Sequence, residues 1–312
     1  SLEEAVKVSR ELKDDRSMSL SIWRLGLTRA LNCEFEKASQ YFENALTIMQ
    51  SLNIPWEISA INSYLSIWGY GFSGKLDRVE QTSKKAMRIA EENGDIYSKS
   101  MAYTSRGFYL YQKGFPEEAK EYLLKALHFC ETIDFVVFNA MARIFLAELY
   151  YDIGEYQNSE KHHAGALSAL KKYEVYKSWT TFHQLGVARS MVMNKANTLD
   201  LNKLYCYVND NKVILFDGWK QRYLGEILFH LGDQYISEAE KWIRKAINSD
   251  GKCGMILDLA RDYKILAGLL REKGDKHQAK ENLNKAINIF QKFGADGWVE
   301  RTKRERASCL SK

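Results

Sequence analysis

A glycine-rich run suggests phosphate chemistry at first sight. Residues 69–75 read GYGFSGK, which contains both a Gly-x-Gly-x-x-Gly string and a Gly-x4-Gly-Lys string. Both motifs bind phosphate only between a strand and a helix, because backbone amides and a helix N-terminus must meet the ligand. The second motif also needs Ser or Thr after the lysine, and Leu76 stands there. We expect this run to end a helix and to bind no nucleotide.

The six histidines show no spacing typical of a metal site. His162 and His163 are adjacent, so they point to different faces of a helix, and neither has a carboxylate or cysteine three or four residues later. We expect His163 to pack inside and His162 to face outward. No Ser-His-Asp arrangement follows from linear order, because such triads are defined by geometry. The sequence therefore predicts no metal, no cofactor and no enzyme activity.

The elements that position these residues are indicated by a repeat. Small residues return every 40 residues, with a single interval of 41 between Ala45 and Ala86. Such a period indicates one helical unit repeated and stacked, because a single unit cannot bury its apolar face alone. The series consists of Ala5, Ala45, Ala86, Ala126, Ala166, Cys206, Ala246 and Ala286.

A second series has the same period and marks a turn within each unit. Gly and Asn tolerate the left-handed conformation that ends a helix, so each unit is predicted to be helix, tight turn, helix. The series consists of Cys33, Gly74, Gly114, Gly154, Asn194, Gly232 (two positions early) and Gly274.

The unit at 100–127 carries the fullest pattern. Its key residues are Gly107, Gly114, Ala119, Leu123 and Ala126. This pattern resembles the tetratricopeptide repeat family. The resemblance implies an all-α fold, a right-handed superhelical solenoid of about seven to eight helix-turn-helix repeats.

We expect one solenoid domain over 1–312. Residues 1–16 read as the second helix of a truncated first repeat, 17–294 as the repeats, and 295–312 as a C-terminal capping helix. Because no first helix precedes 1–16, we expect the chain to be a fragment of a longer protein.

The repeats depart from the family pattern in length. The family period of about 34 residues leaves six more per unit here, or roughly 9 Å of additional helix. The fifth repeat, at about 178–210, is the most degenerate, with Asn194 in place of Gly and Cys206 in place of Ala.

The last repeat supports a more specific resemblance. Its pattern, with Ala279, Leu283, Ala286, Phe290 and Trp298, resembles the C-terminal repeat region of bacterial STAND-type signal-transduction ATPases, such as the maltose-regulon activator. In that family the array is the implied sensor and docking arm of a signalling or transcription-regulating ATPase. The alternative resemblance is to the peptide-binding arrays of Gram-positive quorum-sensing regulators.

The tetratricopeptide resemblance also implies a concave groove lined by the first helix of each repeat. Aromatic residues offer large contact area and arginines pair with carboxylates, so we expect a groove for a peptide or protein segment that is partly apolar and partly acidic. The groove candidates are Trp23, Tyr64, Trp68, Phe108, Tyr111, Tyr151, Arg222, Arg261, Lys264 and Arg271. Glu148 and Glu226 occupy the same register.

Two classes of function stay open at this point. The first is a non-enzymatic protein-interaction and sensor scaffold. The second is a small-molecule inducer receptor with a pocket in the degenerate fifth repeat, near Trp179, His183, Trp219 and Arg222, because ligand sites often interrupt regular packing.

Composition narrows the partner classes. The net charge of +5 is modest for 312 residues, and the basic excess lies near the C-terminus and forms no continuous stripe, which disfavours nucleic-acid binding. The chain has no apolar run of eighteen residues and no signal peptide. The five cysteines form no CxxC pair and read as reduced, so we expect a cytoplasmic protein that does not bind membranes.

Overall fold

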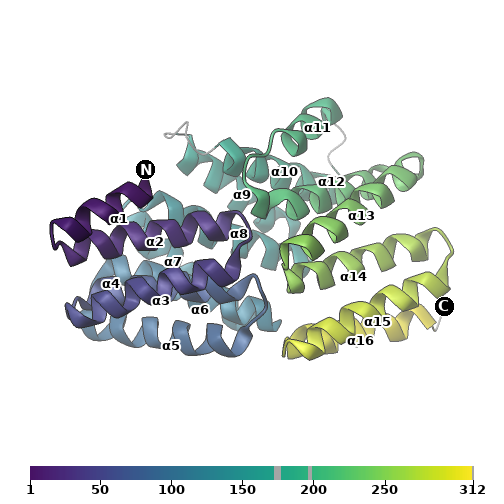
Figure 1. Ribbon diagram of the computed structural model, residues 1–312. Coiled ribbons are helices and arrows are strands. Elements are labelled where there is room, and N and C mark those ends of the chain that lie inside the picture. Colours follow the sequence, from purple (N-terminus) through teal and green to yellow (C-terminus); the bar gives the residue numbers. More distant parts are fainter. Residues whose placement is uncertain (172–176, 196–198, 311–312) are drawn as a thin grey trace. The chain divides into compact units, whose positions relative to one another are not determined.

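The computed structural model describes residues 1–171, 177–195 and 199–310. These residues form sixteen α-helices and no strand (Figure 1). The helices alternate between the first and second member of each repeat, called helix A and helix B below. The predicted all-α, tetratricopeptide-like helical repeat fold is therefore confirmed. Part of the degenerate fifth repeat, at 196–198, lies outside the described residues.

The helices have nearly regular bounds. Helices A are α2 (Asp15–Leu31), α4 (Pro55–Tyr64), α6 (Ile96–Lys113), α8 (Val136–Asp152), α10 (Lys177–Met193), α12 (Asp217–Leu231), α14 (Ile256–Glu272) and α16 (Asp296–Leu310). Helices B are α1 (Leu2–Glu11), α3 (Phe35–Ser51), α5 (Leu76–Asn93), α7 (Pro116–Thr132), α9 (Tyr156–Leu170), α11 (Leu201–Asn209), α13 (Ile236–Cys253) and α15 (Lys276–Lys292).

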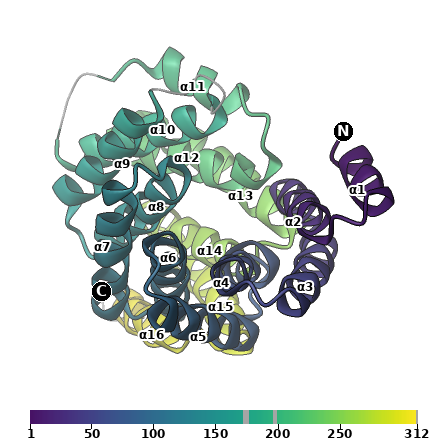
Figure 2. The same ribbon diagram turned by 90° about the vertical axis from the view of Figure 1, so that its left-hand side faces the viewer.

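The chain divides into two compact units, which we describe separately. Unit 1 comprises residues 1–112 and 117–142, and unit 2 comprises 113–116 and 143–312. In unit 2, α14, α15 and α16 run side by side in alternating directions (Figure 1). Figure 2 shows several helices of unit 1, among them α2, α3 and α4, close to end-on.

The small residues of the 40-residue series occupy the core. Six of them are completely buried: Ala45, Ala86, Ala126, Ala166, Ala246 and Ala286. The close approach that requires small side chains is clearest at Gly107 of α6, where an added Cβ would lie 2.5 Å from Cγ of Leu123 in α7. Cys206 departs from the series because it is exposed on α11, which has only nine residues.

The predicted turn positions have the expected conformation. Cys33, Gly74, Gly114, Gly154, Gly232 and Gly274 all have positive φ. The prediction for Asn194 is wrong by one residue, because Lys195 takes the left-handed conformation there, with φ of 61°. A left-handed residue thus separates helix A from helix B in these repeats, except at Gly232, whose φ of 133° is combined with an extended ψ of 171°.

The glycine-rich run belongs to a π-helix, η1 (Leu65–Gly71), which continues α4. The left-handed Gly74 follows the start of α4 by 19 positions, whereas Gly114 follows the start of α6 by 18. The π-helix therefore holds one additional residue without shifting the following helix, which accounts for the interval of 41 in the small-residue series. Gly71 permits close packing here, since an added Cβ would lie 2.2 Å from the ring of Phe108.

None of the described helices combines the length and the apolar character that a membrane span requires.

Candidate binding site in unit 2

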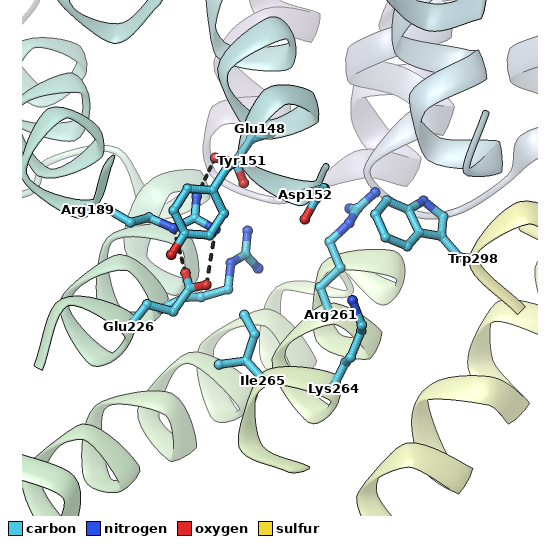
Figure 3. A pocket seen from close by; sticks show the side chains of 10 residues that line it. Glu148, Tyr151, Asp152, Arg189, Glu226, Arg261, Lys264, Ile265 and Trp298 are labelled. Atoms are coloured by element: carbon cyan, nitrogen blue, oxygen red, sulfur yellow. Dashed lines mark hydrogen bonds and ion pairs between the residues drawn. The ribbon is translucent and has the colours of Figure 1, made fainter. Parts of the chain in front are cut away.

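A cavity of about 180 Å³ lies among helices A of unit 2. Five consecutive helices A, from α8 to α16, contribute its walls (Figure 3). The lining residues are Glu148, Tyr151 and Asp152 of α8, Arg189 of α10, Arg222 and Glu226 of α12, Arg261, Lys264 and Ile265 of α14, and Trp298 of α16.

Arg189 lies at the centre of one wall and joins three helices. Its Nη1 is 2.7 Å from Oε1 of Glu148, and its Nε is 2.8 Å from Oε2 of Glu226. The guanidinium carbon also lies 3.4 Å from the ring centroid of Tyr151 and 4.4 Å from that of Tyr223. Figure 3 shows Arg189 enclosed by Glu148, Tyr151 and Glu226. Two ion pairs and two ring faces hold this buried cation.

The charges in this wall shift one another's pKa values. Burial opposes the charge of Arg189, but the Glu148 and Glu226 carboxylates more than compensate, and its pKa stays well above the ordinary value. Burial raises the pKa of Glu226 and of Asp152. Tyr223 donates a hydrogen bond to Oε1 of Glu148, which also accepts from Arg189, so one carboxylate joins α8, α10 and α12.

Arg222 of α12 also lines the cavity, and its guanidinium group contacts three aspartates. Its Nη1 is 3.0 Å from Asp262 and 3.7 Å from Asp250, and its Nη2 is 3.4 Å from Asp258. Arg261 Nη1 lies 3.1 Å from the same Asp258. Three carboxylates therefore face two guanidinium groups in a buried cluster. Burial, followed by the charge of Asp262, raises the pKa of Asp250 well above its ordinary value.

The opposite wall is built around Trp298. The guanidinium carbon of Arg261 lies 5.0 Å from its ring centroid, and the Lys264 ammonium lies 5.6 Å away. Lys264 also lies 3.5 Å from Oε2 of Glu305. Figure 3 shows Arg261 reaching toward the face of Trp298, with Lys264 beside it. These contacts fix the cation-bearing side of the cavity.

Solvent reaches only part of the lining. Tyr151, Asp152, Lys264 and Ile265 are half-buried, whereas the other lining side chains are buried. The lining contains no Ser, Thr, Cys or His, and the described residues contain no group of three or more side chains suited to hold a metal ion. The cavity therefore offers one accessible carboxylate, one ammonium and two apolar surfaces for a polar ligand group.

Four predicted site residues meet at this cavity: Tyr151, Arg222, Arg261 and Lys264. The expectation that Arg222 and Arg261 face an open groove is wrong, because both are buried and paired with aspartates for which the sequence made no prediction. Arg271 is exposed, lies beside Glu272 and does not line the cavity.

The predicted groove residues of unit 1 divide into two groups. Trp68, Phe108 and Tyr111 are buried, so the expectation that they face an open groove is wrong. Phe108 packs against Phe72 at a centroid distance of 5.5 Å. Trp23 and Tyr64 are half-buried, with their rings in edge contact at 4.7 Å. Their role in binding stays a prediction.

The alternative pocket of the fifth repeat is filled by its own aromatic side chains. His183 and Trp219 are buried, and Trp179 is half-buried against Phe216 at 5.3 Å. Phe182 lies at the centre, 5.5 Å from Trp219 and 5.4 Å from His183. The expectation of open space among these residues is therefore wrong, although Arg222 does line the cavity described above.

The histidines occupy the core to a greater extent than expected. His163 is buried as predicted, but His162 is buried too, stacked on Tyr150 at 5.3 Å, so its expected outward direction is wrong. Nδ1 of His163 lies 3.0 Å from Nδ1 of His183, which requires one ring to donate and the other to accept.

Most residues that hold the site together were not predicted from the sequence: Asp152, Arg189, Asp250, Asp258 and Asp262. One signal was available. Glu148 and Arg189 are 41 residues apart, and Arg222 and Asp262 are 40 apart, so opposite charges recur at the repeat interval. In a stacked array, one repeat interval places residues on neighbouring helices, where such charges pair.

Comparisons with known proteins agree with this architecture. A tetratricopeptide repeat model matches residues 265–293, and a search of curated proteins found no match. The apo form of RapI is similar over 88% of this chain and 98% of its own, with 16% identity and a TM-score of 0.59. A Rap protein complexed with Competence and Sporulation Factor matches over 99% of this chain and 93% of its own, with 12% identity and a TM-score of 0.51.

A third similar structure is a signal transduction ATPase with numerous domains (STAND), with a tetratricopeptide repeat sensor, from Pyrococcus horikoshii. It matches over 97% of this chain, with 18% identity and a TM-score of 0.53, but the chain covers only 46% of that protein. At these identities the likeness establishes the fold.

Proposed function

We propose that the chain is a non-enzymatic interaction and sensor module, and that the cavity of unit 2 anchors a side chain of a bound peptide or protein segment. The observation that carries this proposal is the construction of the cavity from five consecutive helices A. A segment lying along these helices would meet the half-buried lining residues of α8 and α14, whereas the lining residues of the other three helices are buried. One of the similar structures is a Rap protein with a bound factor, and another contains a tetratricopeptide repeat sensor, which supports the same reading.

The size of the cavity favours a side chain over a whole metabolite. Pockets for drug-sized ligands occupy roughly 300–1,000 Å³, and this cavity holds about 180 Å³. A single long side chain is a better match, with the rest of the segment outside. The aromatic residues of the fifth repeat also fill the space that the small-molecule alternative requires.

The accessible charges define what that side chain meets. The guanidinium groups of Arg189, Arg222 and Arg261 are already paired with carboxylates of the protein. The accessible cation is the ammonium of Lys264, whose partner Glu305 is half-buried. An acidic side chain would approach Lys264 at the rim, whereas Asp152 on α8 would accept a hydrogen bond from the segment.

At the level of the whole protein, we propose that this array is one solenoid domain of a longer cytoplasmic signalling protein. There it would act as the regulatory arm that receives the partner. The STAND protein similar to this chain supports this arrangement, since its repeat sensor is one part of a longer chain.

A display selection with random peptides, followed by calorimetric titration, tests the proposal. We expect selected peptides to bind the purified chain, and Lys264→Glu to weaken binding by at least about tenfold, because the rim charge is reversed. Arg271→Glu is the matched control, since Arg271 lies on the same helix, is exposed and does not line the cavity. Both variants should keep the melting temperature of the native chain.

Two results would count against the proposal. One is equal binding by the Lys264→Glu and Arg271→Glu variants. The other is a chain that no peptide binds but that metabolites stabilise against heat, which would favour a small-molecule receptor.

A further inference from the structure

Unit 1 carries a second cavity, of about 430 Å³, at the N-terminal ends of two neighbouring helices A. Trp56 in the first turn of α4 and Tyr97 in the first turn of α6 line it, together with Asn93 at the end of α5 and Asp95 in the connection before α6. The cavity is open, and Tyr97 is 42% exposed. Exposed aromatic side chains of this size leave apolar surface in water unless a ligand covers them.

The two rings meet nearly at right angles. Their centroids are 6.3 Å apart and their planes enclose 83°. Phe135 stacks on Tyr97 from the side of α8, with centroids 4.4 Å apart and planes at 22°, so the phenol ring is supported from behind. Rings fixed at right angles present π-faces to two sides of a small group between them.

Local hydrogen bonds hold this geometry in place. Asp95 caps α6, accepting from the backbone N–H of Tyr97 at 3.3 Å and of Ser98 at 2.6 Å. The Ser98 hydroxyl donates to Asp95 at 2.5 Å and lies 3.5 Å from the carbonyl oxygen of Trp56. The carboxylate therefore orders the first turn of α6 before any ligand arrives.

The side chains that line the cavity carry one negative charge and no positive one. Asp95 lines it, whereas no Lys, Arg or His does. The nearest lysine on α6, Lys99, lies 3.3 Å from Glu91. An ionised carboxylate has about four acceptor positions, and the three hydrogen bonds to Asp95 leave one of them open.

We propose that the cavity lined by Trp56, Tyr97 and Asp95 binds an alkylammonium group. Two π-faces at right angles and one carboxylate are the groups that attract an ammonium ion and stabilise it after it loses water. The group has two sources, the side chain of a lysine or methylated lysine in a partner protein, or a free quaternary amine. The site is independent of the proposed function of unit 2, because none of its residues lines that cavity.

The test is a titration of the full ¹⁵N-labelled chain with choline, observed at the indole N–H of Trp56. Trp56→Phe assigns this signal. We expect choline to shift it and to bind at least about fivefold more tightly than 3,3-dimethyl-1-butanol, its uncharged isostere, because only the charged ligand gains cation–π attraction. Equal affinities for the two compounds would overturn the proposal, since apolar contact alone would then explain binding.

Three variants separate the contributions of the Tyr97 ring and the Asp95 carboxylate to choline binding. Tyr97→Ala should weaken choline binding at least about fivefold, and Asp95→Asn several-fold, although Asn still caps the helix. Phe115→Ala is the matched control, because Phe115 is an exposed aromatic residue, 38% accessible, outside the cavity. A Tyr97→Ala variant that binds as the Phe115→Ala control does would also overturn the proposal.

Peptides identify the source of the ammonium group. The chain is titrated with acetyl-Gly-Lys-Gly-amide and with the same peptide carrying trimethyllysine. A peptide that binds more tightly than choline assigns the site to a protein partner. Tighter binding of choline than of both peptides assigns it to a free amine.

Discussion

The buried cluster around Arg222 contains three carboxyl groups but only two guanidinium groups. This excess of acids affects the protonation of single residues in the cluster. Ionising all three acids would leave an uncompensated negative charge in the core, which is costly. Burial and the neighbouring Asp262 raise the pKa of Asp250 well above its ordinary value, so Asp250 is the acid of the cluster whose protonation we test. It also packs against Gly218, where an added Cβ would lie 1.7 Å from a carboxylate oxygen.

Substitutions in this cluster should therefore differ sharply. Asp250→Asn mimics the protonated acid and should change the free energy of unfolding by no more than about 1 kcal/mol. Arg222→Met leaves three buried carboxylates with one cation and should cost about 3–5 kcal/mol. Urea denaturation at pH 7 measures both. Similar losses for the two variants would show that Asp250 is ionised in the folded chain.

The buried histidines make a separate prediction about pH. Burial lowers the pKa of His163 to about 3 and of His183 well below its ordinary value, so the folded chain keeps both neutral. In the unfolded chain both histidines take up protons near pH 6.5. Their contribution to the free energy of unfolding is therefore fully present well above about pH 6.5 and is lost as the pH falls below it. From pH 7.5 to 5.0 the loss is about 2 kcal/mol for each histidine that stays neutral.

A comparison of variants isolates this effect from the buried acids, whose raised pKa values act in the opposite direction. The double variant His163→Leu/His183→Leu should lose less of its melting temperature between pH 7.5 and 5.0 than the native chain. His277→Leu, which changes an exposed histidine, should follow the native chain. If the melting temperatures of all three proteins fell equally between pH 7.5 and 5.0, the assignment of neutral histidines would be wrong.

At the scale of single elements, the π-helix makes a prediction about length. If η1 (Leu65–Gly71) holds one residue in excess, deleting Ile67 should convert it to α-helix and leave the chain folded, with a fall in melting temperature of a few degrees. Deleting Leu146, in the middle of α8, should be far more disruptive, because half of that buried helix would rotate by about 100°. Circular dichroism during heating compares the two. Equal losses would show that η1 carries no surplus residue.

The elements also show how far the sequence determines the fold. Ala and Gly at fixed spacing predicted the repeats correctly, because close helix crossings admit only small side chains, as at Gly107. The turn at Asn194 was misplaced by one residue, since Lys195 adopts the left-handed conformation without being Gly or Asn. The interval of 41 was visible in the sequence, but a surplus residue gives no sign of whether a loop or a π-helix takes it up.

The candidate site was less predictable, for a physical reason. Charged residues are rarely buried unless they are paired, so Arg222 and Arg261 were expected to face solvent. The partners of Arg222, Asp258 and Asp262, are distant from it in sequence and become its neighbours only when the repeats stack, whereas Asp258 precedes Arg261 by three residues on the same helix. Likewise, Trp68 and Phe108 have the spacing of groove residues, but a helix surrounded by neighbours buries more than one face.

At the scale of the whole molecule, the chain is an array of tetratricopeptide-like repeats that carries two cavities, and we propose that each binds a ligand group. One cavity, in unit 2, is held by ion pairs between successive helices A. The other, in unit 1, lies at the N-terminal ends of α4 and α6. Because a stacked array is stabilised repeat by repeat, groups contributed by successive repeats form a binding surface without a specialised loop.

The most direct test of this account is the indole N–H signal of Trp298 during titration with a peptide obtained by selection. Trp298 lines the cavity of unit 2, and Trp298→Phe identifies its signal among the seven tryptophans. We predict that this signal shifts with the same dissociation constant as calorimetry gives, and that Lys264→Glu raises the dissociation constant from both measurements to the same extent. A Trp298 signal that stays unchanged while the peptide saturates the chain would show that the peptide binds elsewhere and that the cavity of unit 2 is not the binding site.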